Sequence, residues 1–207
     1  MTIRIAVSAA ALLGLAACGG GGGTLGGPAA TYGLLANEVS SRLDGTGVLI
    51  TAAPTGTGNP TYSGVMLVAV DIDPGDGDPA SNSGYLGEID ITADFGTGSI
   101  SGTADGFFDV DIDTATGKPI GFNTGSNPDG TVVSSGVGFT ASGIDSSPSF
   151  NPDFSGTIDS NTLDGLGSGL VRGNLGQQIT IFETDPSCSV CSFTLNGGEG
   201  DVFIFAD

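Results

Sequence analysis

Apolar and polar residues alternate with a period of two through most of the chain after Gly47. The clearest case is residues 85–95, in which Ile89, Ile91 and Ala93 are separated by acidic residues and threonine. This period is typical of strands that bury one face. Gly96-Thr97-Gly98 then connects to residues 99–104, and the two segments predict a hairpin. Strands are expected at residues 48–52, 61–73, 85–95, 99–104, 107–113, 131–144, 154–159, 169–175, 178–184 and 202–205.

These alternating segments predict an all-β fold, a small closed antiparallel β-barrel of about eight strands over residues 47–207. Closure removes the exposed strand edges that would otherwise aggregate. A β-sandwich is the structural alternative. A membrane-spanning barrel is disfavoured because aromatic girdles are missing. In residues 107–113 the apolar Phe108 and Val110 alternate with Asp109 and Asp111, and we expect such acids to lie on solvated strand faces or in loops.

One segment has helical periodicity instead. Residues 31–43 place Leu34, Leu35, Val39 and Leu43 on one face. Glu38 and Arg42 stand four residues apart, and Gly45 follows as a stop signal. We therefore expect a short helix within residues 31–46, with an extension of the preceding tether as the alternative.

The first residues form an export signal. Arg4 precedes an apolar run, residues 5–15, that is too short to span a bilayer. Leu15-Ala16-Ala17-Cys18 matches a bacterial lipobox. We expect residues 1–17 to be removed as a lipoprotein signal peptide and Cys18 to carry acyl chains, each buried methylene contributing about 0.8 kcal/mol to anchoring. The alternative is an ordinary signal peptide with a chance cysteine.

Residues 18–30 then combine the lipid anchor with a glycine-rich flexible tether. Gly19 after the cysteine is compatible with transport to the outer membrane. We expect a lipid-anchored outer-membrane protein at the cell surface, although no residue distinguishes a surface orientation from a periplasmic one.

The formal net charge of −19 narrows the choice of partners. After the signal peptide the only cations are Arg42, Lys118 and Arg172. Nucleic acid is excluded as a partner because its binding needs clustered basic residues. An anionic membrane surface would repel this acidic domain, so that the lipid on Cys18 is expected to attach the protein to the membrane. We expect a monomer whose partner is an extracellular protein or small molecule.

The residue types argue against catalysis. The chain has no histidine and no tryptophan, so that neither a Ser-His-Asp nucleophile nor an imidazole metal site can form. Only a pair of carboxylates remains for acid–base chemistry. We predict that the protein is not an enzyme and uses no cofactor.

An acidic segment suggests a weak calcium site at Asp73, Asp76 and Asp78. Counted from Asp71, it lacks the glycine at position six and the glutamate at position twelve of an EF-hand loop. Acidic turns that keep the surface soluble are the favoured interpretation.

Cys188 and Cys191 are the remaining thiols, and a disulfide between them is expected in an exported protein. Cys-Ser-Val-Cys also fits a redox motif, but its flanks are not helical.

Several segments resemble surface lipoproteins of the transferrin-binding protein B kind. The lipobox cysteine is followed by a glycine run, residues 56–64 resemble the opening of their barrel domain, and residues 91–102 are the closest match. Residues 154–156, 169–173 and 202–207 are weaker matches. The resemblance implies an eight-stranded barrel whose surface loops hold host iron proteins, complement regulators, haem carriers or polysaccharides.

The chain departs from that family in three ways. It has one barrel with no second lobe, Ile204-Phe205 replaces the glycine and alanine near the closing strand, and arginine-rich segments are absent. Transferrin binding is therefore not carried over.

The expected function is a surface-exposed lipoprotein that binds a protein or small ligand. A periplasm-facing envelope lipoprotein and a calcium-dependent adhesion module are the alternatives. The candidate loops are residues 74–84, 114–130 and 145–153, together with the Cys188–Cys191 staple.

Overall fold

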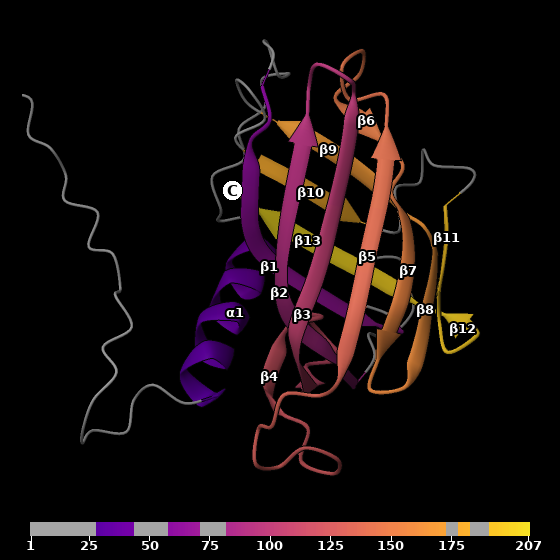
Figure 1. Ribbon diagram of the computed structural model, residues 1–207. Coiled ribbons are helices and arrows are strands. Elements are labelled where there is room, and N and C mark those ends of the chain that lie inside the picture. The colour runs from indigo at the N-terminus through magenta and orange to yellow at the C-terminus, as the bar shows by residue number, and fades with distance from the viewer. Residues whose placement is uncertain (1–27, 44–57, 71–81, 173–177, 183–190) are drawn as a thin grey trace, which may run out of the picture.

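The computed structural model describes residues 28–43, 58–70, 82–172, 178–182 and 191–207, and shows a curled antiparallel sheet with a helix on its outside (Figure 1). The elements are α1 (Pro28–Leu43), β1 (Thr61–Ala69), β2 (Ser83–Asp94), β3 (Ser99–Ile112), β4 (Pro119–Phe122), β5 (Ser135–Ser142), β6 (Ser149–Phe150), β7 (Asp153–Ile158), β8 (Asn161–Leu166), β9 (Ser168–Arg172), β10 (Gln178–Phe182), β11 (Ser192–Leu195), β12 (Gly198–Glu199) and β13 (Asp201–Ala206).

The strand pairings follow the chain. The order β7-β5-β3-β2-β1-β13-β10-β9 is antiparallel at every step, and β7 also pairs with β8. β8 and β9 are consecutive, separated only by Gly167. The sheet therefore curls back on itself, with β8 and β9 meeting at Gly167, and the fold is all-β and barrel-like, as the alternating pattern predicts.

A bent hairpin makes this closure. Ser149 pairs with Leu170 and Asp153 pairs with Leu166, so that β6–β7 and β8–β9 keep one register on both sides of the bend. Before the bend β8 pairs with β11, and after it β9 pairs with β10. β6 and β7 thus act as one strand and β8 and β9 as another, which gives eight positions around the circuit.

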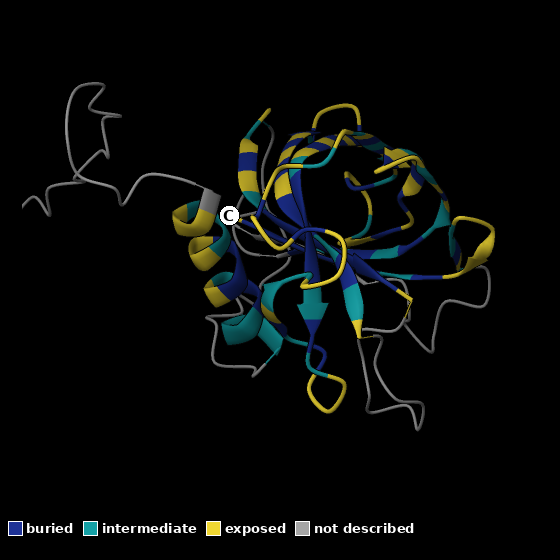
Figure 2. Ribbon diagram, turned by 90° about the horizontal axis from the view of Figure 1, so that it is seen from below, coloured by how far each residue is buried: buried dark blue, intermediate teal, exposed yellow. Residues whose placement is uncertain are grey.

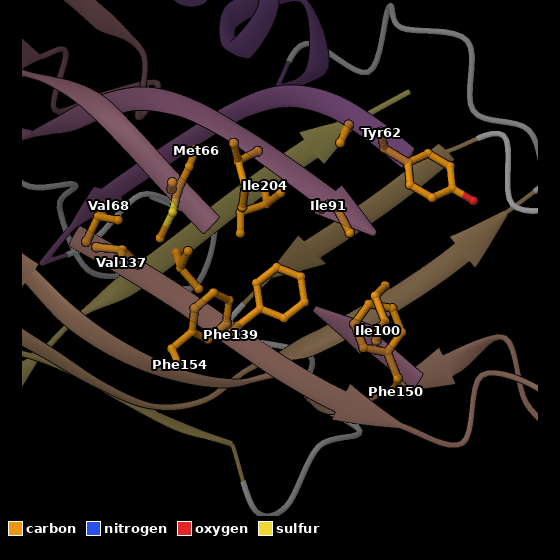
Figure 3. Packing of buried hydrophobic residues seen from close by; sticks show 14 of the residues in the cluster. Tyr62, Met66, Val68, Ile91, Ile100, Val137, Phe139, Phe150, Phe154 and Ile204 are labelled. Atoms are coloured by element: carbon orange, nitrogen blue, oxygen red, sulfur yellow. The ribbon is translucent and has the colours of Figure 1, made fainter. Parts of the chain in front are cut away.

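Apolar side chains fill the inside of the barrel (Figure 3). The rings of Phe139 and Phe154 lie 5.3 Å apart between centroids, and Phe193 packs against Phe154 at 5.7 Å. Met66 of β1 and Ile204 of β13 approach from the other side of the barrel (Figure 3). The interior of the described barrel is thus a packed core.

The end of the barrel that carries the β2–β3 turn is also apolar. Phe95 and Ile144 project from the β2–β3 and β5–β6 turns into the core and are buried. The Gly98 carbonyl accepts hydrogen bonds from the backbone amides of Gly143 and Ile144, which ties the two turns together. Tyr62 lies at the same end, where burial raises its pKa to about 12. These side chains plug this end.

A second apolar cluster lies outside the barrel, where α1 covers strands β1, β2, β3 and β13 (Figure 2). Leu35 and Val39 of the helix pack in this cluster with Phe108 and Phe205 of the strands. The Arg42 guanidinium lies 3.4 Å from the Phe205 ring centroid and the same distance from Glu38, the partner that the sequence spacing indicates. Parts of β1 and β13 are therefore buried on both faces.

This outer cluster corrects two sequence-based predictions. Phe108 and Val110 face outward beneath α1, and Asp109 faces the inside of the barrel, the reverse of the expected arrangement. Leu34, expected on the apolar face of the helix, is 71% exposed. α1 also begins at Pro28, three residues before the predicted start, in agreement with the preference for proline in the first helical turn.

Other strand predictions differ in their limits. The two strands predicted at residues 99–104 and 107–113 form the single strand β3, which ends at Ile112 and passes an irregularity opposite Leu86 and Glu88 of β2. β4, β6, β8, β11 and β12 were not expected. The strand predicted at residues 48–52 lies outside the described residues.

Replacement of Leu35 by alanine tests the docking of α1. Leu35 is 9% exposed and its neighbour Leu34 is 71% exposed, so that the two leucines form a matched pair. Leu35→Ala should lower the free energy of unfolding by about 2 kcal/mol or more, because it removes buried methyl groups and leaves a cavity. Leu34→Ala should change it by no more than about 0.5 kcal/mol. Equal effects in urea-induced unfolding would contradict the observed orientation of the helix.

Candidate functional site

The open end of the barrel, opposite the plug, carries a pocket of about 260 Å³. We call it the mouth; Figure 2 looks at the barrel from this side. Its lining includes Tyr85, Asp109, Asn123, Asn161 and Asn196. Val70 and Leu195 add apolar surface at its lip.

Strand register places the polar groups on the inner face. Tyr85 pairs with Val68, which belongs to the inner core, and Asp109 pairs with Tyr85 on the other side. Directly paired residues project to the same face of a sheet, so that Asp109 points inward. Asn161 pairs with the core residue Ile158 in the same way. The inner face thus changes from apolar to polar as the strands reach the mouth.

Asp109 is the one charged residue that is buried within the described part of the chain, with 8% of its surface exposed. The Ser126 hydroxyl donates a hydrogen bond to its Oδ2. No described residue donates to Oδ1. A buried carboxylate is costly unless it is hydrogen-bonded. Asp109 lines the pocket, and the acceptor capacity of its Oδ1 is unused by the described residues.

The segment that supplies Ser126 is held by Asn127. This side chain is 5% exposed; its Nδ2 donates to the Thr131 carbonyl at 2.9 Å, and its Oδ1 accepts from the Thr131 amide at 2.8 Å. Asn123 begins the same loop, and its Oδ1 accepts from the amides of Gly125 and Ser126. Because Asn123 Oδ1 accepts these hydrogen bonds within the loop, the amide nitrogen Nδ2 is the atom available to donate to a ligand in the mouth.

Asn161 and Tyr85 form a second fixed pair. Asn161 Nδ2 donates to the Tyr85 hydroxyl at 2.8 Å. Burial raises the pKa of Tyr85 and the charges of Asp109 and Asp159 raise it further, while the bond from Asn161 acts in the opposite direction. Tyr85 therefore keeps its proton at neutral pH and can donate a hydrogen bond.

Two tight turns border the mouth. Asp159 and Ser160 have φ values of 48° and 69°, and Asn196 and Gly197 have values of 53° and 77°. Successive residues in this left-handed region form the two-residue turns that suit the twist of a hairpin. They fix Asn161 and Asn196 at the rim.

Other acids serve as turn caps. Asp94 Oδ1 accepts from the amides of Gly96 and Thr97, and Asp113 Oδ1 accepts from the Ala115 amide. The amide of Thr97 chiefly lowers the pKa of Asp94, and that of Ala115 chiefly lowers the pKa of Asp113. Sequence reasoning expected solvated acids with unperturbed pKa values. The lowered pKa values of Asp94 and Asp113 and the burial of Asp109 contradict that expectation.

A larger hollow of about 560 Å³ lies where β6 bends away from β5. It is lined by Thr140, Ser142, Ser149 and Asp153, all exposed, over the ring of Phe150. It contains no buried charged group, which makes the mouth the better candidate site.

Most sequence-predicted site residues lie outside the described residues. These are Cys18, Cys188 and the calcium candidates Asp73, Asp76 and Asp78. Cys191 is disulfide-bonded, but its partner is not among the described residues, so that pairing with Cys188 stays a prediction. Within the described ranges, no three His, Cys, Asp or Glu side chains gather in a group suited to a metal ion.

Sequence reasoning missed the mouth residues Tyr85, Asp109, Asn161 and Asn196. Two of the candidate loops contribute described residues to the mouth: residues 114–130 through Asn123, and residues 74–84 through Ser83 and Gly84. The available signals were the Asp159-Ser160 and Asn196-Gly197 turns, which mark strand ends. The inward direction of Asp109 had no signal in the local sequence.

Comparison with known proteins adds no family: no protein-family model matches the chain, and no curated protein matches it in sequence. The fold and the mouth define an all-β barrel with one apolar and one polar end. None of the described helical structure is long and apolar enough to cross a membrane.

Replacement of Asn127 tests whether the mouth is pre-formed. Asn127→Ala removes the hydrogen bonds to Thr131 and should lower the free energy of unfolding by about 1–3 kcal/mol, because it leaves buried backbone groups unpaired. Asp129→Ala, an exposed residue of the same loop, should change it by no more than about 0.5 kcal/mol. Urea-induced unfolding gives both values, and an Asn127→Ala variant as stable as the Asp129→Ala control would refute the anchoring role.

Proposed function

We propose that the protein is a lipid-anchored outer-membrane protein, exposed at the cell surface, whose barrel binds a ligand at the mouth without catalysis. The observation that carries the binding role is the contrast between the barrel ends. One end is plugged by Phe95 and Ile144, and the other holds a pocket with the buried carboxylate of Asp109. Asp109 Oδ1 receives no hydrogen bond from the described residues, so that it is available as an acceptor to a ligand in the pocket that Asp109 lines.

Binding without chemistry fits the groups present. Tyr85 is held in its protonated form by the rise in its pKa, so that it acts as a hydrogen-bond donor and not as a nucleophile. The chain has no histidine to serve as its base. Apart from the Asp109 carboxylate, the remaining polar groups of the mouth are amides and hydroxyls, which orient a ligand and do not exchange protons near neutral pH.

The sequence supports the lipid anchor and the membrane location. The order Arg4, a short apolar run and Leu15-Ala16-Ala17-Cys18 supports removal of residues 1–17 and acylation of Cys18. The lipid holds a strongly acidic body near a membrane that its charge would otherwise avoid.

Intact mass measurement of the protein extracted from membranes tests the anchor. The wild-type chain should start at Cys18 and carry the added mass of its acyl groups. Cys18→Ser should lack this mass and leave the membrane fraction, because its lipid attachment is gone. The matched variant Cys191→Ser removes a different cysteine and should keep the acyl mass. A wild-type protein without acyl groups would remove the anchoring role.

Protease treatment of intact cells tests the orientation. The barrel of a surface-exposed protein should be cleaved in intact cells, whereas a periplasm-facing envelope lipoprotein should be cleaved only after the envelope is broken. A periplasmic protein of the same cells is the control for envelope integrity. Full protection of the wild-type chain in intact cells would replace the surface assignment with the periplasmic alternative.

A further inference from the structure

We propose that the mouth binds a small, uncharged, polyhydroxylated molecule, of the size of a single sugar residue or polyol. This inference deepens the proposed binding function and rests on it. It follows from the hydrogen-bonding groups that the described residues of the mouth leave available, from their mixture of donors and acceptors, and from the size of the pocket.

The available acceptors are two oxygens. Asp109 Oδ1 receives no hydrogen bond from the described residues, and Asn161 Oδ1 is likewise unused because the contacts of this side chain run through Nδ2. Both residues line the mouth and come from different strands, β3 and β8, which are separated by β5 and β7 in the sheet. A ligand in the pocket therefore meets acceptors from two strands.

The available donors are interspersed with them. The Tyr85 hydroxyl accepts from Asn161 and keeps its own proton for donation. Asn123 uses its oxygen within the loop and leaves Nδ2. Asn196 makes no side-chain hydrogen bond within the described part of the chain. The mouth thus offers donors and acceptors side by side.

This mixture selects among ligand classes. A hydroxyl group both donates and accepts, so that a polyol can satisfy neighbouring groups of either kind. An ammonium ion only donates and would leave the donors of the mouth, the Tyr85 hydroxyl and Asn123 Nδ2, unpaired. An anion would meet the buried Asp109 carboxylate in a chain whose net charge is −19. An apolar ligand would leave every polar group unsatisfied, at a cost for each.

Size and lining agree with one ring. The volume of about 260 Å³ is below the range of about 300–1,000 Å³ that holds drug-sized ligands. Val70 and Leu195 at the lip give the C–H face of a ring an apolar surface. Val70 is 57% exposed, and a ligand that removes this apolar surface from water gains binding free energy.

The mouth groups are held in place before a ligand arrives. Ser126 fixes Asp109, Asn127 fixes the loop that carries Ser126, and Asn161 is fixed by Tyr85. Binding therefore orders few side chains, which lowers the entropic cost of association. Such a site can select a small ligand even with few contacts.

The test uses the full-length mature protein in detergent and saturation-transfer difference NMR. The probes are glucose, galactose, mannose and N-acetylglucosamine, with glucosamine as the cationic and glucuronate as the anionic counterpart. We expect at least one neutral sugar to bind with a millimolar dissociation constant and more tightly than both charged counterparts. Absence of binding by all neutral sugars, or preference for a charged counterpart, would overturn the inference.

Three variants locate the binding. Asp109→Asn should weaken binding of the neutral sugar about tenfold or more, because it replaces an ionised acceptor. Asn196→Ala removes an exposed side chain of the mouth and should weaken it about two- to tenfold. Asn37→Ala on the exposed side of α1 is the matched control and should leave it unchanged. Unchanged affinity in both mouth variants would place the sugar elsewhere and overturn the inference.

The results distinguish failure of the ligand class from failure of the proposed function. If no sugar binds but another small molecule does, and Asp109→Asn and Asn196→Ala weaken its binding, the mouth remains a binding site and only the polyol class is wrong. If Cys18 carries no lipid but a sugar binds, the anchoring role fails and the ligand class stands.

Discussion

The burial of β1 and β13 on both faces is the constraint on which the rest of the structure depends. Their inner side chains fill the barrel, and their outer side chains, such as Leu67 and Phe205, form an apolar strip that water would otherwise cover. α1 covers this strip with Leu35 and Val39. Since an exposed patch of this kind promotes association, the helix is a necessary part of the barrel's surface, and it fixes which side of each strand faces inward.

This constraint explains what the sequence could predict. Residues 85–95 have one solvent-exposed face and one buried face. There the period of two correctly predicted that Ile89, Ile91 and Ala93 point inward. In β3 the pattern changes partway: Ile100 faces the core and Phe108 faces the helix. Apolar residues mark burial, but a local pattern does not tell a core from a covering helix, so the direction of Asp109 required the tertiary structure.

The sequence predicted that the sheet would curl into a barrel, but it did not predict which strands would meet or how. An antiparallel sheet with alternating faces needs closure to remove its edges, and the chain achieves this by bending one hairpin at Gly167 while keeping its register. β8 and β11 were missed because their segments are short and each has a single fully buried residue, Leu163 in β8 and Phe193 in β11, which is too few to define a period. The candidate site lies near these missed elements, since Asn161 and Asn196 belong to their turns.

The acids divide into two structural classes. Asp94 and Asp113 are accessible and accept amides of their own turns, so that their charge stabilises the connections between strands. The Asp109 side chain points to the inside of the barrel. The one described partner of its carboxylate, Ser126, belongs to the loop that follows β4. A carboxylate needed only for a turn would sit at the surface, as the other two do. Its inward position at the polar end is made possible because α1 covers the apolar neighbours Phe108 and Val110, and this position is the reason that we propose this end of the barrel as the binding site.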